Sequence, residues 1–545
     1  MKPIAPARMF RWIVAALFFL LLATAAKQKF SQPLTPIFDP DTPGYLNPAL
    51  SQLSGHGLLQ TQGRSFLYPV LTLGLLKTTG DLRSIVVMQH LASLLTAVVW
   101  MGIWIAWSSF LPRNWTRDFL APLAGLAAVG LYLVSAETVL FGLQVRPEAV
   151  FPLAASLQLL CLMAFIKARW PAGSRSKPGL VLASGAGAML FSVAAYNLKP
   201  SWGFAILLSP FVLGIGALFR RRGRPIRWTA APLVLGSLLA LLLLAAVPAA
   251  LKWKPDNASK AFLPMLLFAV HANIISDYLQ EEVNAGKATP EEAEFSSRLQ
   301  AGIEQSRNPL GAYRLLGHNP DYLMFGSKTL NVIPNVSTLE ERKAFYFRSF
   351  FSAMAKFPDR FLKKWLSQLQ AAVFQDPKYM CRPSGNLKKL YSISSKCPNT
   401  LHPGLPGDLV RSCSQTGIET AALASQLPGS QVMGPKWLKK AGVVGGFLYP
   451  SSLLAGILLL VAAPFLFRDH IRPVLAASLV SAAALLSAMT VAFVHSFDID
   501  RYLSLQSWLA WLTIACWIVV VFSIVESGLR RLFQGRNADG KATPA

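Results

Sequence analysis

Long apolar segments alternate with short polar segments along most of this chain. A helix needs about 17 to 25 apolar residues to cross the hydrocarbon core of a bilayer. The pattern predicts ten transmembrane helices, the shorter ones least strongly, near residues 13–26, 85–110, 119–134, 149–166, 180–196, 202–218, 230–251, 443–467, 474–494 and 503–525. The first follows three basic residues and is not followed by a convincing small-residue cleavage site, so we interpret it as a retained anchor.

Two polar regions between these segments are too long to be simple connectors. They divide the chain into four expected parts: an N-terminal transmembrane module (1–251) with a first outer loop at 27–66, an extracytoplasmic domain (252–441), C-terminal transmembrane helices (442–527) and a cytoplasmic basic tail (528–545). The expected fold class is an all-α polytopic membrane protein whose extracytoplasmic domain is mainly helical.

The extracytoplasmic domain shows two local signals. Ser337 and Glu340 have the spacing of a capping box, which predicts a long amphipathic helix reaching about Phe374 and interrupted at Pro358. The apolar segment 261–270 is too short to cross a membrane and is expected to lie in the membrane interface.

Composition and charge agree with a membrane protein. Of 545 residues, 53% are hydrophobic and 14% charged, and the mean hydropathy is +0.42. The basic residues that produce the formal charge of +26 gather in alternate loops, which by the positive-inside rule predicts two cytoplasmic termini. Because much of this charge reports topology, it gives no reason to expect nucleic acid as a partner. We expect a bacterial inner membrane, with the large domain periplasmic.

Cysteines and nucleotide motifs add little. Cys381, Cys397 and Cys413 fall in the outer domain, where one disulfide is plausible in an oxidising compartment, but the sequence does not choose the pair. The chain has no P-loop, no GxGxxG after a strand, no GxSxG elbow and no internal repeat.

Every short outer loop, in contrast, carries polar residues capable of chemistry. The candidates are Asp39, Asp41, Tyr45 and Arg64 in the first loop, Glu137, Arg146 and Glu148 in the second, Lys199 in the third, His495, Arg501 and Tyr502 in the last, and His271 in the outer domain. Carboxylates can activate a hydroxyl, while arginine and lysine can hold a phosphate. The alternative for any single member is a structural ion pair that only neutralises charge near the membrane.

The segment Asp41-Thr-Pro-Gly-Tyr45-Leu-Asn-Pro-Ala49 resembles the Asp-Ser-x-x-Tyr-x-x-x-Ala stretch in the first outer loop of GT-C glycosyltransferases, with Thr42 in place of serine. Arg146-Pro-Glu148 at the start of a span, Lys199 between two close spans and Arg501-Tyr502 at the start of the last span are also similar to this class. The nearest branch is the protein mannosyltransferase and aminoarabinose transferase group, whose members differ in their outer domains.

The resemblance implies a glycosyltransferase that moves a hexose or pentose from a polyprenyl-phosphate donor to a lipid, glycan or protein acceptor outside the cytoplasm. Asp41 would be the general base, with Asp39 as its rival. The two would share a face if the segment were extended, because side chains alternate there with a period of two. Arg64, Lys199 and Arg501 would stabilise the departing phosphate, and Glu137 and Glu148 would bind sugar hydroxyls or orient the cations. Mg²⁺ or Mn²⁺ is possible, but no residue is assigned to a metal.

Two other classes stay open. A transporter or lipid flippase usually places its charges near the bilayer midplane and contains an internal repeat. A non-catalytic envelope-assembly protein would bind a partner through its outer domain and would tolerate replacement of Asp41.

Overall fold

The structure is a computed structural model, and it describes residues 6–60, 63–169, 177–218, 226–307, 313–327, 329–331, 338–374, 377–395, 403–427, 432–497 and 500–539. Within these ranges the chain is an all-α polytopic membrane protein, as predicted. Nine helical segments are long and apolar enough to cross a membrane. They are Pro6–Phe30, Arg83–Ser108, Thr116–Val134, Pro147–Arg169, Pro178–Leu198, Ala230–Ala250, Leu438–Leu466, Arg468–Val494 and Arg501–Arg531.

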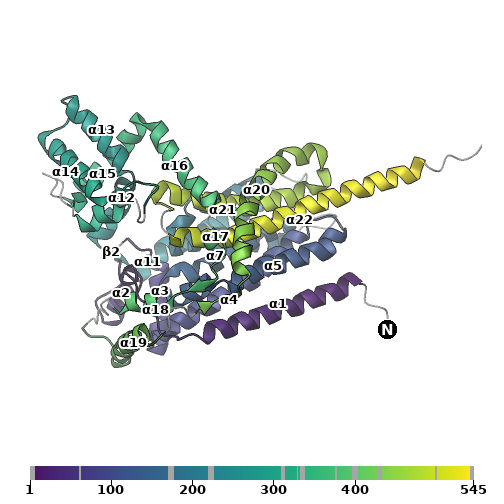
Figure 1. Ribbon diagram of the computed structural model, residues 1–545, viewed down its shortest axis with the longest axis horizontal. Helices are drawn as coiled ribbons and strands as arrows, with labels where there is room; N and C mark the ends of the chain where they lie inside the picture. The colour runs from purple at the N-terminus through teal and green to yellow at the C-terminus, as the bar shows by residue number, and fades with distance from the viewer. Residues whose placement is uncertain are drawn as a thin grey trace, which may run out of the picture.

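These spans contain most of the long helices in Figure 1. The helices are α1 (Pro6–Phe30), α4 (Arg83–Ser108), α5 (Ala121–Val134), α7 (Phe151–Arg169), α8 (Pro178–Leu198), α10 (Ile226–Leu241), α11 (Val247–Ala250), α20 (Leu438–Leu466), α21 (Ile471–Val494) and α22 (Asp500–Asp539). Short π-helical or 3-10 turns extend several of them: η1 (Thr116–Leu120), η2 (Pro147–Ala149), η5 (Leu242–Ala246) and η8 (Arg468–His470). Nine of the ten predicted spans are therefore confirmed as helices of sufficient length.

The remaining predicted span, 202–218, is shorter in the described residues than a full crossing. It consists of the turns η3 (Pro200–Trp202) and η4 (Ala205–Leu207) followed by α9 (Leu208–Leu218). At the end of α8 the chain reaches Lys199, which forms an ion pair with Glu148. After α10 and α11 it reaches Lys254, whose backbone pairs as a strand with Leu59 of the first outer loop. Because both points lie among the outer loops, α9 and α10 form a pair that leads the chain away from this end and back.

The start of α1 and the end of α22 both lie at the right of Figure 1, whereas helices α12 to α16 lie at the upper left. This arrangement agrees with an even number of crossings. Which side of the membrane each end faces stays a prediction, and the loops and helices called outer are those at the end that contains α12 to α16.

The first outer loop is partly helical. It contains α2 (Thr42–Leu53), β1 (Leu59–Gln60) and α3 (Leu67–Thr79), while α6 (Ala136–Leu143) lies in the second loop. The strand β1 pairs in parallel with β2 (Lys254–Pro255), which ties this loop to the beginning of the outer domain.

One group of outer helices has its own apolar core. Its helices are α12 (Asn257–Val270), α13 (Ala272–Asn284), α14 (Pro290–Ser306), α15 (Leu339–Lys356) and α16 (Pro358–Val373), with the turns η6 (Tyr322–Gly326) and η7 (Thr329–Asn331). The chain bends by 81° between α12 and α13. Phe268 and Val270 are buried here against residues of α14 and α15. The segment expected in the membrane interface is thus part of a protein core.

The amphipathic helix of this group starts one residue later than predicted. Ser337 lies outside the described residues, and the capping box is formed by Thr338 and Glu341, each accepting a hydrogen bond from the other's backbone N–H. The predicted interruption is confirmed, because α15 ends at Lys356 and α16 restarts at Pro358.

A second outer group packs partly on the first loop and partly on α20 and α22. It comprises α17 (Pro377–Met380), β3 (Ser384–Gly385), α18 (Leu387–Ser394), α19 (Gly407–Gln426) and β4 (Val432–Met433), with β3 and β4 antiparallel. The first loop is contacted through α18 and α19, and α20 and α22 through α17. Glu419 of α19 pairs with Arg83 and accepts a hydrogen bond from Thr35. Of the three cysteines between which the sequence left a disulfide open, Cys381 and Cys413 are buried and Cys397 lies outside the described residues, so the choice of a pair stays open.

Candidate active site

The acidic segment before α2 forms a tight turn. The Oδ1 atom of Asp39 accepts hydrogen bonds from the backbone N–H groups of Asp41 (2.8 Å) and Thr42 (3.1 Å), and the N–H of Asp39 donates to the Thr42 hydroxyl (2.9 Å). Asp41 has helical backbone angles, φ −86° and ψ −21°, and Pro43 follows in the first turn of α2. The segment is therefore not extended, so the period-two argument for a shared face does not apply, and the turn sets the directions of the two carboxylates.

Asp41 sits among three arginines from distant parts of the chain. Its Oδ1 lies 2.6 Å from Nη2 of Arg64, and its Oδ2 pairs with Arg501. Arg146 pairs with Asp39 and lies 3.6 Å from Oδ2 of Asp41. The first loop, the second loop and the start of α22 thus meet at one carboxylate.

A second carboxylate extends this network into the helices. Glu148, in the turn that begins the fourth span, is almost fully buried, and its Oε1 accepts a hydrogen bond from Nζ of Lys199 at 2.6 Å. Nη1 of Arg146 lies 3.9 Å from the same oxygen. Arg146 therefore links the Asp39–Asp41 turn to the Glu148–Lys199 pair, and we call these residues, with Arg64 and Arg501, the charged cluster.

Two tyrosines border the charged cluster. The guanidinium carbon of Arg64 lies 5.0 Å from the centre of the Tyr45 ring, and Lys199 Nζ and Arg501 Cζ lie 5.2 Å and 5.3 Å from the centre of the Tyr502 ring. Such cation–π contacts hold the cationic groups in place while leaving their N–H groups for other partners.

The pKa values of the two aspartates are shifted in opposite directions. Burial alone would raise the pKa of Asp41, but Arg501, Arg64 and Arg146 outweigh it and hold this pKa well below its usual range. Burial raises the pKa of Asp39, and the neighbouring Asp41 adds to this, although Arg146 acts against them. Asp41 is therefore a carboxylate kept ionised by its cations, whereas Asp39 is the weaker acid of the two.

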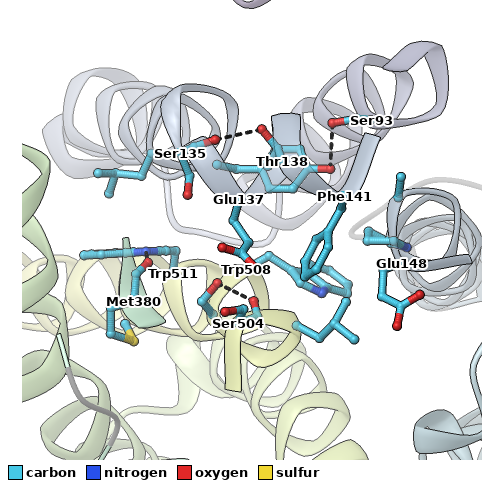
Figure 2. Close-up of a pocket in the computed structure, with 16 residues that line it drawn as sticks. Ser93, Ser135, Glu137, Thr138, Phe141, Glu148, Met380, Ser504, Trp508 and Trp511 are labelled. Atoms are coloured by element: carbon cyan, nitrogen blue, oxygen red, sulfur yellow. Dashed lines mark hydrogen bonds between the residues drawn. The ribbon is translucent and has the colours of Figure 1, made fainter. Parts of the chain in front are cut away.

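Glu137 lies in a neighbouring pocket instead of the charged cluster. Its Oε2 pairs with Nη1 of Arg382 at 3.0 Å. Figure 2 shows the pocket, in which Glu137 and Glu148 flank Phe141, with Trp508 and hydroxyl-bearing serines close by. Glu148 thus belongs both to this pocket and to the charged cluster.

The two candidate histidines differ in position. His495 packs on Tyr502, with ring centres 4.9 Å apart, and burial with the field of Arg501 and Lys364 lowers its pKa to about 3, so its imidazole stays neutral. His271 stacks on Phe361 in the core of the outer group, and its Nε2 lies 3.2 Å from Nζ of Lys364.

Of the candidates predicted from the sequence, the structure brings ten together: Asp39, Asp41, Tyr45, Arg64, Arg146, Glu148, Lys199, His495, Arg501 and Tyr502. Glu137 and His271 lie beside this group. Sequence reasoning missed Arg382, Lys364 and Gln368. The last two fall on the buried stripe of an amphipathic helix, where polar residues are unusual, and that was the available signal.

The charged cluster does not fit a divalent cation. Asp39, Asp41 and Glu148 are each paired with an arginine or lysine, and among the residues that the structure describes there is no group of three or more histidine, cysteine, aspartate or glutamate side chains suited to a metal. The cations of the protein occupy the positions that a metal would need.

Fold and site together define a polytopic membrane protein with a cationic, carboxylate-containing centre at one end of its spans. No protein-family profile and no curated protein matches the chain. Among solved structures, the crystal structure of ArnT from Cupriavidus metallidurans bound to undecaprenyl phosphate overlaps 92% of this chain and 77% of that chain, at 12% identity and a TM-score of 0.26. A score this low does not establish a common fold.

Proposed function

We propose that this protein is a GT-C-type glycosyltransferase that moves a sugar from a polyprenyl-phosphate donor to an acceptor on the extracytoplasmic side of the membrane. The observation that supports this proposal most strongly is the charged cluster. In it, carboxylates pair with Arg64, Arg146, Lys199 and Arg501 near the ends of membrane helices. Charge at that depth is costly and is retained mainly where it binds or transforms something charged.

The donor phosphate would bind between Arg64 and Arg501. Each guanidinium group carries several N–H donors, and each donates to Asp41. The phosphate gains negative charge as the bond to the sugar breaks, so cations in this position stabilise the transition state more than the ground state. Lys199, paired with Glu148, would complete this binding region.

Asp41 would be the general base that takes the proton of the acceptor hydroxyl as its oxygen attacks the anomeric carbon. A phosphate that shares Arg64 and Arg501 would weaken their hold on the carboxylate. The pKa of Asp41 would then rise toward its ordinary value, which makes it a better proton acceptor. Asp39 suits this role less well, because its Oδ1 holds the turn and its Oδ2 pairs with Arg146.

The position of the charges favours this proposal over a transporter. The charged cluster joins outer loops and helix ends, whereas transporter sites lie near the bilayer midplane in broken helices. A non-catalytic assembly protein would not need a carboxylate surrounded by three arginines beside a buried lysine–glutamate pair.

Mass spectrometry of a deletion strain tests the proposal. Loss of the gene should cause one polyprenyl-phosphate sugar to accumulate and one sugar to disappear from the lipid, glycan or protein pool. Wild-type protein and Asp118→Asn should restore both pools, because Asp118 pairs with Arg11 near the far end of α1. Asp41→Asn should restore neither. Unchanged pools in the deletion strain would contradict the proposal.

A further inference from the structure

Two side chains of α16, Lys364 and Gln368, form hydrogen bonds with residues 492–497, at the end of α21 and just beyond it. We call these contacts the grip. Nζ of Lys364 donates to the backbone oxygens of Ala492 (3.0 Å) and His495 (3.4 Å) at the end of α21. One turn further along α16, the Oε1 atom of Gln368 accepts hydrogen bonds from the backbone N–H of Phe497 (2.6 Å) and the hydroxyl of Ser496 (3.3 Å).

The spacing of these two residues explains how one helix makes both contacts. Residues four apart lie on the same face of an α-helix. Lys364 donates to the carbonyl of Ala492, one of the last carbonyls of α21, which have no helical partners, and to the carbonyl of His495 just beyond the helix. Gln368 is fully buried and satisfies backbone and side-chain donors just beyond. Together they fix both the end of α21 and the direction of the following chain.

The grip also reaches the outer helical group. Nε2 of His271, at the bend between α12 and α13, lies 3.2 Å from Nζ of Lys364. The Nδ1 of this imidazole lies 2.8 Å from the backbone oxygen of Leu267, so Nδ1 is the donor and Nε2 is left to accept from the lysine. Lys364 thus joins the bend of the outer group to the membrane helix.

The gripped segment leads directly to the charged cluster. His495 packs on Tyr502, and Arg501 at the start of α22 pairs with Asp41. A shift of this short connection would move the Arg501 guanidinium relative to Arg64 and Asp41, which are held by the first loop.

We propose that Lys364 and Gln368 are positioning residues, which set Arg501 and Tyr502 in place from the outer domain without touching the substrate. The expected effect on catalysis rests on the proposed function, whereas the hydrogen bonds between α16 and residues 492–497 do not depend on it. The outer domain would thereby take part in donor binding through α16, in addition to any contact with the acceptor.

The test compares Lys364→Met with Lys363→Met in full-length protein. Lys363 is the exposed neighbour on the same helix and serves as the matched control. Hydrogen–deuterium exchange should become faster in the peptide spanning 492–505 for Lys364→Met and stay at the wild-type rate for Lys363→Met. The KM for the polyprenyl-phosphate sugar should rise about twofold to thirtyfold with a smaller change in kcat, the usual size for coupling through intermediate residues. Lys364→Arg, which keeps the charge and donors, should recover most of both effects.

Should Lys364→Met fail to fold, the same two measurements are made on Gln368→Met, with the exposed Gln370→Met as control; wild-type exchange in a folded Gln368→Met protein would then overturn the grip. A folded Lys364→Met protein with wild-type exchange in 492–505 would overturn the grip. Faster exchange with an unchanged KM would overturn the positioning role. If wild-type protein used no polyprenyl-phosphate sugar, the proposed function would fail, while the exchange measurement would still decide whether α16 holds this segment.

Discussion

Replacing Asp41 by asparagine should separate turnover from donor binding. Asparagine keeps the size and polarity of the side chain but has no basic oxygen to receive a proton. In the structure this change removes the negative charge that Arg64 and Arg501 share, and it leaves the turn formed by Asp39 and Thr42 intact. We therefore expect a folded protein with an altered site.

Replacing Asp41 by asparagine should lower kcat and, at the same time, strengthen binding of the donor. Loss of a general base lowers kcat by about a hundredfold to ten-thousandfold. The Asp41 carboxylate, about one quarter exposed at 23%, competes with a donor phosphate for the same arginines. Discounted for solvent, removal of this competition is worth about 1 kcal/mol, which is roughly a fivefold lower Kd for the donor.

The assay uses purified protein in nanodiscs, with the donor identified by mass spectrometry and its Kd measured by binding of labelled lipid. Asp39→Asn is assayed in parallel. Its amide oxygen can still accept from the N–H groups of the turn, so it should lose mainly the pairing with Arg146 and retain more turnover than Asp41→Asn. Wild-type kcat in Asp41→Asn with loss in Asp39→Asn would move the base to Asp39. Equal losses of binding and turnover in Asp41→Asn would make it a structural counter-ion.

Three further predictions concern topology, stability and pH. A reporter active only outside the cytoplasm should work when fused after Pro406 and fail after Arg224 or at the C-terminus; activity at the C-terminus would make the number of crossings odd. Glu148→Gln should lower the free energy of unfolding by about 3 to 5 kcal/mol, because it leaves Lys199 buried without a carboxylate. In a thermal unfolding assay, the double variant that also carries Lys199→Met should recover part of this loss. Burial lowers the pKa of Lys364 from 10.5 to about 7, so the unfolded chain holds the proton more tightly than the folded one. The free energy of unfolding should therefore rise from about pH 7 to 10.5 in wild type and lose this rise in Lys364→Met; the imidazole of His271, which contacts Lys364, stays neutral throughout because burial lowers its pKa well below 6.5.

The membrane layout was predictable because apolar length is a strong and local signal. The span 202–218 shows where that signal weakens, since η3 and η4 interrupt it and only α9 is regular helix. The position of the capping box was wrong by one residue, because serine at 337 and threonine at 338 both have a glutamate three residues later and only the surrounding chain decides between them.

The candidate site was predictable as a set but not as a geometry. Charged residues next to spans are costly enough to stand out one by one. Which cation meets which carboxylate depends on how distant loops pack, as for Arg501, whose partner Asp41 comes from the other end of the chain. For Lys364 the sequence offered only its position on the buried stripe of an amphipathic helix, because its partners are mainly backbone carbonyls that no residue type identifies.

The composition of the charged cluster also sets a charge balance for the proposed reaction. Four cations (Arg64, Arg146, Lys199, Arg501) face three carboxylates (Asp39, Asp41, Glu148), which leaves one positive charge in excess. A sugar-linked polyprenyl phosphate is a diester with one negative charge, so its binding makes the centre neutral. Transfer creates a monoester with two negative charges, and the proton taken up by the base keeps the centre neutral. Once that proton escapes to water, one negative charge is left over, and the site repels the spent carrier that it had just held.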